Sequence, residues 1–392
     1  MTVERASGAA QGSVEALPLT PAQRGMWFAE NLSPDYSVNV AQYLDIRYEP
    51  GSFDHELFGD CTLAAGRVLQ SPYVRLVDLE DGSPGQVVDP DLPITVDIID
   101  FRGEDDPEAA AIEWMCEEYR RPLDIRSDAL VLSRLLRIAD DRTFWYGRGH
   151  HIVIDGWSLP ILLQEIFARY FRQRLPAAAS YRSFVTWLAG QDRDAAHAAW
   201  RSVLEGFDTP TLVAAPAAPG PRAVDSFRIS AETTKALADL ARAQHTTVST
   251  VLQGAWAQIL MWLTGQHDVA FGTAVSGRPA DVAGADEMVG LLINTVPVRA
   301  SITPSTTVAD LLGQIQGNHN DTLEHDHLAL NHIHHATGHE QLFDTMFVYE
   351  NYPIDAAALS GAHGLTVSAF SSKEFNHYPL SVTAIPGDGL RL

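Results

Sequence analysis

The sequence predicts a mixed α/β (α+β) fold made of two lobes. A chain of 392 residues that is 46% hydrophobic is longer than a single core usually supports, so two cores are expected. Strand-like and helix-like patterns alternate along the chain, which favours the α/β class. An alanine-rich break at Pro176–Ser180 marks a boundary. We therefore predict a flexible lead-in over 1–16, an N-terminal lobe over 17–176 and a C-terminal lobe over 177–392.

The N-terminal lobe is expected to begin with a helix that Thr20 caps and in which Pro21 takes the first position. Each later element follows from its own periodicity. They are a strand over Val38–Tyr48, a helix over Glu56–Leu69, a hairpin over Val74–Val88 that turns at Asp81–Gly82, a strand from Arg142 to Tyr146 and a helix that ends near Leu175.

The C-terminal lobe shows a similar alternation. Its predicted elements are a helix over Ser249–Leu263, a strand from Val269 that leads to a turn at Ser276–Pro279, a strand over Val289–Arg299 and a strand over Phe343–Tyr352. Asn294 and Thr295 interrupt the apolar run of the second of these strands. Buried polar side chains need partners, which are either groups in a central channel or backbone groups.

Composition restricts the possible partners. The net charge of −23 argues against nucleic acid and against an anionic membrane, because phosphate recognition needs a basic footprint. No apolar run approaches the length of about 20 residues that a membrane helix needs. Cys61 and Cys116 have no metal-ligand spacing, so neither a disulfide framework nor a zinc site is predicted and a reducing cytoplasm fits. A protein partner is expected.

The window from Gly149 to Ser158 holds the candidate reaction site. It lies between a predicted strand and a predicted helix, which Ser158 can cap. Near neutral pH a histidine can take a proton from an attacking nucleophile or hydrogen-bond a charged tetrahedral intermediate, and His151 is the candidate for one of these catalytic roles. In an extended backbone neighbouring side chains alternate faces, so His150 is expected to point elsewhere and to support the structure.

Asp155 has two possible roles in this window. It can orient His151 as the carboxylate of a triad does, or it can form a buried ion pair that shapes the loop. Arg278, at the end of a strand in the other lobe, is the candidate partner for a bidentate bridge between lobes. Gly156 offers a position without a side chain, either for a turn or for substrate clearance.

The string His150-His151-Ile-Val-Ile-Asp155-Gly156 resembles the HHxxxDG signature of condensation domains from nonribosomal peptide synthetases, which share the chloramphenicol acetyltransferase-like fold. Further segments resemble other motifs of that family: Thr20 to Trp27, Ser276 to Pro279, Val289 to Arg299 and Phe343 to Tyr352. The stretch from Arg67 to Arg75 departs from the second motif because most of its charged residues are missing. The resemblance runs from Leu17 to Leu392.

The resemblance implies a V-shaped pseudo-dimer of two lobes with a central tunnel and with His151 midway along it. Donor and acceptor groups would arrive as thioesters on the phosphopantetheine arms of two peptidyl carrier proteins, next to adjoining synthetase domains. The family needs no metal and no cofactor of its own, although six histidines lie between 325 and 339. The C-terminal lobe is expected to lack its last few dozen residues. The candidates for the channel are Trp157, Ser158, Asn294, Tyr349, Asn351 and Ser381.

Two alternatives to peptide-bond formation remain. A catalytically silent platform that recruits another enzyme usually has a damaged motif, whereas the motif here is complete. An epimerisation-type relative shares the motif and would use a second acid or base in the other lobe. The segments around Asn294 and Asn351 resemble condensation domains more closely.

Overall fold

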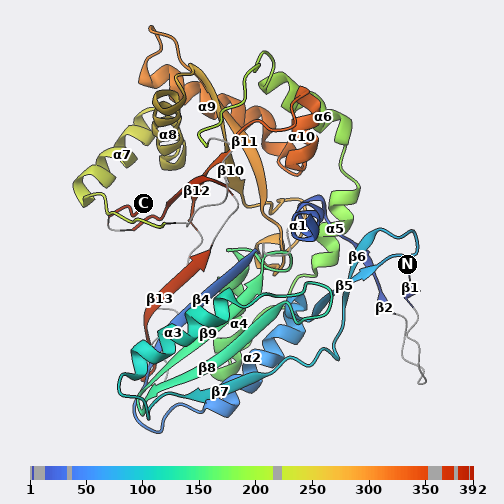
Figure 1. The fold of residues 1–392 in the computed structure, drawn as a ribbon, viewed down its shortest axis with the longest axis vertical. Helices are drawn as coiled ribbons and strands as arrows, with labels where there is room; N and C mark the ends of the chain where they lie inside the picture. Colours follow the sequence, from blue (N-terminus) through green and yellow to red (C-terminus); the bar gives the residue numbers. More distant parts are fainter. Residues whose placement is uncertain are drawn as a thin grey trace. The chain divides into compact units, whose positions relative to one another are not determined.

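The chain divides into two units in the computed structural model, which describes residues 2–3, 14–32, 38–214, 223–351, 364–374, 378–387 and 389–392 (Figure 1). Unit 1 contains the described residues of 1–190, 278–292 and 352–375. Unit 2 contains those of 191–277, 293–351 and 376–392. Each unit is therefore assembled from stretches that lie far apart in the sequence.

This division differs from the boundary predicted at residue 176. The helix α5 (Tyr181–Ala189) belongs to unit 1 because the Tyr181 hydroxyl donates to the carbonyl of Leu291 (2.7 Å). The same helix also contributes to an apolar cluster with the 278–292 segment, formed by Phe184, Val282, Ala285, Met288 and Leu292. A segment that was predicted to belong to the C-terminal lobe thus completes the core of unit 1.

A five-stranded sheet forms the centre of unit 1, in the order β13-β4-β9-β8-β7. Its strands are β4 (Asn39–Arg47), β7 (Val96–Asp100), β8 (Val131–Ala139), β9 (Arg142–His150) and β13 (Thr366–Glu374). Neighbouring strands are antiparallel except β7 and β8, which are parallel. Its helices are α1 (Pro21–Leu32), α2 (His55–Leu69), α3 (Pro107–Arg120), α4 (Ser158–Tyr170) and α5.

Helices cover both faces of this sheet (Figure 1). On one face Leu44 and Trp145 pack in a cluster with side chains of α2 and α4. On the other face Tyr146 and Phe144 pack with α3. Because side chains alternate along a strand, β4, β8 and β9 contribute apolar side chains to the clusters on both faces of the sheet.

A smaller three-stranded sheet of unit 1 is made of β3 (Leu17–Pro18), β6 (Pro84–Val88) and β5 (Val74–Asp78). The antiparallel pairing of β5 with β6 confirms the predicted hairpin. The altered stretch from Arg67 to Arg75 runs from α2 into the first strand of this hairpin. In it, Arg67 lies over the Tyr73 ring and Arg75 pairs with Asp89 (3.3 Å). Farther upstream, β1 (Thr2–Val3) pairs with β2 (Val14–Glu15), and the rest of the predicted lead-in up to residue 13 lies outside the described residues.

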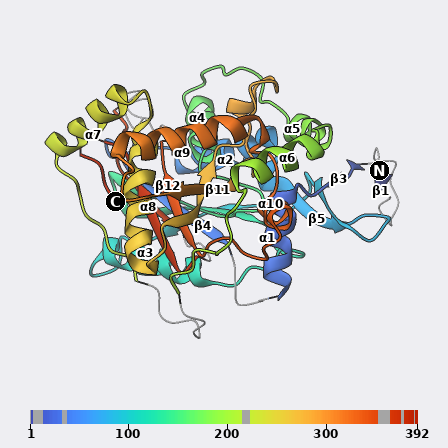
Figure 2. The ribbon, with the colours of Figure 1, turned by 90° about the horizontal axis from the view of Figure 1, so that it is seen from above.

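Unit 2 is built on a four-stranded sheet in the order β11-β10-β12-β14. Its strands are β10 (Asp268–Val275), β11 (Asn294–Ser301), β12 (Thr345–Tyr349) and β14 (Leu380–Ala384). Its helices are α6 (Arg193–Val203), α7 (Ala231–Ala243), α8 (Val248–Thr264), α9 (Val308–Thr322) and α10 (Leu330–Thr337). In its main core α8 packs on α9 and on β10, and α9 packs on β11. Figure 2 shows α9 crossing α8.

Two strand boundaries predicted for this region need correction. β11 begins at Asn294 and not at Val289, because Gly290 and Leu291 bond with side chains of α4 and α5 instead of a neighbouring strand. β12 is shorter than predicted, and Tyr352, the expected end of that strand, lies outside the described residues.

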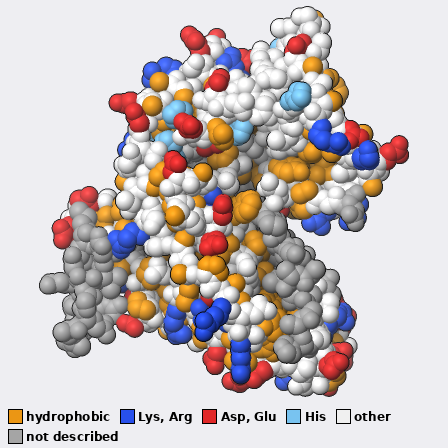
Figure 3. All heavy atoms as spheres, turned by 180° about the vertical axis from the view of Figure 1, so that it is seen from behind, with side chains coloured by type: hydrophobic (Ala, Val, Ile, Leu, Met, Phe, Trp, Pro, Cys, Tyr) orange, Lys and Arg blue, Asp and Glu red, His pale blue; other side chains and the backbone are white. Residues whose placement is uncertain are grey.

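Acidic and basic side chains share the face of the molecule that is drawn in Figure 3. On the face drawn in Figure 3, red acidic side chains are interspersed with blue basic ones, and no single field of one sign dominates. None of the helices in the described part of the chain combines the length and the apolar character that crossing a bilayer needs.

Candidate functional site

The predicted strand, loop and helix around the histidine pair are present. β9 ends at His150, and the backbone N–H of His151 then donates to the carbonyl of Val38 (2.9 Å). Ile154 turns back over Gly149, where a Cβ atom would lie only 2.8 Å from the Ile154 side chain. The loop can pack against its own strand because that position is glycine.

His150 is fully buried and is held at both ring nitrogens. Its Nε2 donates to the carboxylate of Glu30 on α1, and its Nδ1 accepts from the backbone N–H of Ile152 (3.0 Å). Because Nδ1 is an acceptor, the ring hydrogen is on Nε2 and the neutral tautomer is fixed. This geometry favours a supporting role for His150.

His151 is also buried, with 4% of its surface exposed, but its ring is held differently. Its Nδ1 lies 3.0 Å from the carbonyl oxygen of Ile154. A carbonyl oxygen can only accept a hydrogen bond, so Nδ1 donates and the lone pair of the neutral ring is on Nε2. A lone pair on a fixed imidazole can accept a proton from an attacking amine.

Asp155 is saturated with hydrogen bonds. Its Oδ1 accepts from the backbone N–H of Ser158 (2.9 Å) and its Oδ2 from that of Leu292 (3.0 Å). The guanidinium of Arg278 donates to both carboxylate oxygens, at 3.1 and 3.2 Å, and the two side chains are 0 and 2% exposed. The predicted ion pair is therefore confirmed, and since Ile154 holds Nδ1 of His151, the geometry favours this role over that of a triad carboxylate.

The prediction that this ion pair bridges the two lobes is wrong. Arg278 opens the 278–292 segment, which belongs to unit 1 together with Asp155. The pair therefore holds that segment to the loop between β9 and α4. Arg278 also donates to the carbonyl of Met288 (3.1 Å), and its guanidinium carbon lies 5.8 Å from the centre of the Trp157 ring.

Ser158 does not cap α4, contrary to prediction. It is the first residue of the helix, Trp157 stands at the cap position without a side-chain bond, and Asp155 accepts the Ser158 N–H instead. The Ser158 hydroxyl lies 2.7 Å from Oδ1 of Asp155 and 3.0 Å from both the N and the O of Gly290. Gly156 is half-buried in the turn between Asp155 and the helix.

The remaining channel candidates lie in unit 2. Asn294 donates to the carbonyls of Asp326 and Leu328, both at 2.7 Å, so backbone groups are its partners. Tyr349 is half-buried at the end of β12 and contacts the main core of unit 2. Ser381 is half-buried on β14, and Asn351 is exposed. Their role in a channel stays a prediction.

Asp326 carries a perturbed carboxyl group in unit 2. Burial raises its pKa to about 7. Its Oδ1 has no hydrogen-bond partner among the residues that the structure describes. The deprotonated form is therefore stabilised less in the folded chain than in water.

Replacing Asp326 with asparagine is expected to make folding less sensitive to pH. The pKa of this carboxyl is higher in the folded chain than in the unfolded one, so the wild type loses stability as the pH rises from about 4 to about 7. The variant should therefore gain about 1 kcal/mol or more over the wild type at pH 8, and nothing at pH 4. Urea unfolding at both pH values measures this, and an equal difference at both would contradict it.

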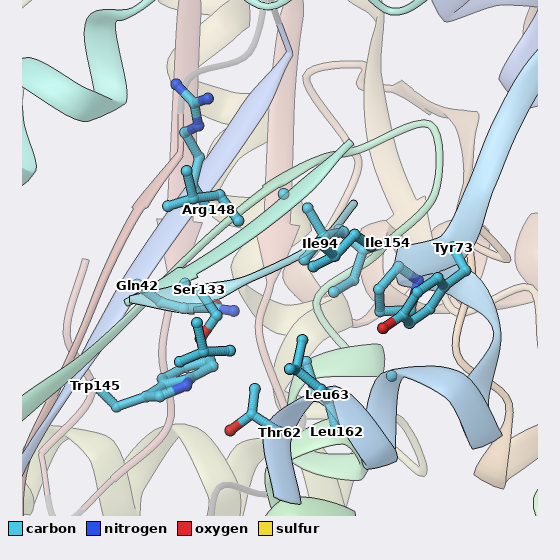
Figure 4. A pocket seen from close by; sticks show the side chains of 17 residues that line it. Gln42, Thr62, Leu63, Tyr73, Ile94, Ser133, Trp145, Arg148, Ile154 and Leu162 are labelled. Carbon is cyan, nitrogen blue, oxygen red and sulfur yellow. The ribbon is translucent and has the colours of Figure 1, made fainter. Parts of the chain in front are cut away.

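At least two cavities lie among the described residues of unit 1. The smaller, about 40 Å³, is a packing gap between α2, α4 and the sheet, lined by Leu63, Leu162 and Trp145 among others (Figure 4). The larger, about 180 Å³, is lined by residues that include Gln23, Val153 and Tyr181. Val153 connects the larger cavity to the histidine loop, whereas His151 lines neither cavity.

The histidines between 325 and 339 do not form a ligand cluster. Among the residues that the structure describes, no three His, Cys, Asp or Glu side chains converge as the ligands of a metal ion would. Several of these histidines bond to backbone carbonyls instead: Nδ1 of His327 lies 3.1 Å from the carbonyl of Glu324, and Nε2 of His339 lies 2.9 Å from that of Phe207.

The family model described as the condensation domain matches residues 14–392. The chain belongs to the condensation domain family. Condensation domains of nonribosomal peptide synthetases form peptide bonds and act on thioesters that are bound to carrier proteins, so this chain is an acyltransferase of the amide-forming class.

The relatives of this condensation domain are multidomain synthetases. It is 30% identical over 96% of its length to vanchrobactin synthetase VabF from Vibrio anguillarum, and 31% identical over 94% to surfactin synthase subunit 3 from Bacillus subtilis (strain 168). Over 64% of its length it is 41% identical to chondramide synthase cmdD from Chondromyces crocatus. The chain spans only 14, 30 and 7% of these proteins, respectively.

Solved structures establish the fold. The first condensation domain of the CDA synthetase aligns over 96% of this chain and 92% of its own, with a TM-score of 0.76 and 22% identity. A starter condensation domain of rhizomide synthetase aligns over 96% of this chain and 87% of its own, with a TM-score of 0.81 and 21% identity. The predicted mixed α/β fold with two chloramphenicol acetyltransferase-like lobes is thereby confirmed.

Two residues of α1 that the sequence patterns did not single out as site residues hold the histidine loop of this condensation domain. Gln23 donates from Nε2 to the carbonyl of Ile152 (2.8 Å), and Glu30 accepts from His150. Both side chains are buried. Gln23 and Glu30 are seven residues apart and so lie on one helix face. Both are polar residues on a helix face that is buried. Because buried polar groups need hydrogen-bond partners, this pattern could have identified them from the sequence.

Proposed function

We propose that this condensation domain transfers an acyl or peptidyl group from a donor carrier protein to the amine of an aminoacyl group on an acceptor carrier protein. Each group is held as a thioester on a phosphopantetheine arm that the carrier brings, so the chain itself needs no cofactor. The two carriers and adjoining synthetase domains are the partners. A cytoplasmic location and the tunnel that the family resemblance implies belong to the same proposal.

The position of His151 carries the proposal. The amine nitrogen attacks the thioester carbon, so that a C–N bond forms and the C–S bond breaks. The amine loses a proton to Nε2 of His151, whose ring is held by the Nδ1–H bond to the Ile154 carbonyl. The same proton then passes to the departing thiolate of the donor arm. Atoms and charges balance without a further reactant.

Positioning contributes the larger part of the expected rate. Two tethered substrates that meet at one histidine react as a single molecule would, which can lower the barrier by about 7–11 kcal/mol when the geometry is favourable. The burial of His151, and the attachment of its backbone to Val38, supply the fixed frame that this requires.

The proposal is tested with two loaded carriers and the wild-type chain. A donor carrier that holds an acyl or aminoacyl arm and an acceptor carrier that holds an aminoacyl arm are mixed with the chain, and intact-protein mass spectrometry follows both. We expect the donor mass to appear on the acceptor carrier. Binding of both carriers without transfer above the uncatalysed background would contradict the proposal and support a recruiting platform.

A further inference from the structure

Glu30 connects the first helix to the backbone on both sides of His151. It lies in the last turn of α1, and its carboxylate is buried. One of its oxygens, Oε1, accepts from Nε2 of His150 and from the backbone N–H of Val38 (3.1 Å). Val38 in turn accepts the backbone N–H of His151 (2.9 Å) through its carbonyl. A single carboxylate oxygen thus fixes the residue before His151 and the residue opposite it.

The proton positions in this group follow from the acceptors. Nδ1 of His150 accepts from Ile152, so the neutral ring donates from Nε2 to Glu30. The carboxylate therefore accepts two hydrogen bonds and transfers no proton. Its role depends on where the oxygen lies, because both donors must reach the same atom.

We propose that Glu30 is a positioning residue for His151. It holds His150 and Val38 so that the His151 backbone keeps its place and Nδ1 stays on the Ile154 carbonyl. This inference rests on the proposed function of His151. Displacement of a reacting group by about 1 Å can cost up to about a hundredfold in rate, so a small shift of this frame is sufficient to matter.

Three substitutions separate position from charge. Glu30→Gln keeps an acceptor oxygen at the same distance and removes the charge. Glu30→Asp keeps the charge and withdraws the oxygen by about 1.5 Å, one carbon–carbon bond. Glu30→Ala removes both. If the position of the acceptor oxygen determines activity, Glu30→Gln should behave like the wild type. Glu30→Asp and Glu30→Ala should then show similar losses.

Asp45 supplies a matched control. It is a buried carboxylate on β4 that accepts two bonds from Arg142, each 2.9 Å, and it lies near the opposite end of the strand pair from His150. The substitutions Asp45→Asn and Asp45→Ala should destabilise the same unit without touching the histidine loop. Thermal unfolding of each variant shows whether the losses of stability are comparable.

The first readout is the rate of transfer between loaded carriers. For Glu30→Asp and Glu30→Ala we expect kcat to fall about tenfold or more, with KM for each carrier within about twofold of the wild type. Glu30→Gln should stay within about threefold of the wild type, as should both Asp45 variants. Wild-type kcat in Glu30→Asp and Glu30→Ala would overturn the inference.

The second readout needs no activity. ¹⁵N NMR of the histidine rings reports which nitrogen carries the hydrogen. The wild type and Glu30→Gln should show His151 with the hydrogen on Nδ1, and Glu30→Asp should show a mixture of the two tautomers. An unchanged His151 signal in Glu30→Asp would contradict the inference. An inactive wild type would count against the proposed function alone, because the ring signals would still decide the role of Glu30.

Discussion

Replacing His151 with alanine is expected to lower kcat for transfer between loaded carriers by about 10²–10⁴-fold, the usual contribution of a positioned acid or base. Nε2 is the ring atom that can take the amine proton, because Nδ1 donates to the Ile154 carbonyl. Alanine leaves no acceptor there. Intact-protein mass spectrometry of the acceptor carrier, sampled over time, measures the loss.

KM for the two carriers should change little in this variant, because the imidazole acts on the reacting atoms and not on the carrier surfaces. His55→Ala is the matched control. His55 is half-buried in the same unit and its Nε2 bonds to Thr143, near the far end of β9 from the histidine loop. That variant should keep a rate near that of the wild type. If His151→Ala stays within about threefold of His55→Ala, His151 is not the proton acceptor.

Local sequence patterns predicted the framework of the site. The strand before His150 and the helix after Trp157 follow from side-chain periodicity, which depends on neighbouring residues. The pairing of Asp155 with Arg278 was predicted across more than a hundred residues because a buried carboxylate needs a cation, and an arginine at a strand end offers a bidentate one.

Long-range packing set the limit of these predictions. Nothing in the periodicity of Val289–Arg299 shows that its first residues bond to Ser158 and Tyr181, so the strand was predicted too long and the 278–292 segment was assigned to the wrong lobe. The contact of Glu30 with His150 joins residues 120 positions apart. Polar residues on an amphipathic helix show that partners exist, but periodicity does not identify them.

Gly290 is a single residue whose long-range contact could not be predicted from the local sequence pattern. A Cβ atom there would lie 2.4 Å from the Tyr181 ring, so that only glycine lets the 278–292 segment approach α5 so closely. In the sequence this glycine reads as an interruption of a strand pattern. Glycine is required at this position because it contacts a helix that lies more than a hundred residues earlier in the chain.

Replacing Arg278 with methionine is expected to lower the free energy of unfolding by about 3–5 kcal/mol, because it leaves the buried Asp155 carboxylate without its counter-charge. Both side chains of the pair are at most 2% exposed, so solvent screens their charges little. The variant also loses the bond to the Met288 carbonyl. Denaturant unfolding, monitored by circular dichroism, measures the effect.

A double-mutant cycle shows whether the loss comes from the charge pair. Asp155→Asn alone should be destabilising, since it leaves the guanidinium buried without a counter-charge, and the two substitutions combined should cost at least about 1–2 kcal/mol less than their sum. Arg102→Met is the control, because Arg102 is paired with the partly exposed Asp100 and the largely exposed Asp140, so its loss should be far smaller than that of Arg278→Met. Additive losses for the buried pair would mean that methionine disturbs packing in the 278–292 segment. In that case the ion pair would not be what holds the segment to the histidine loop.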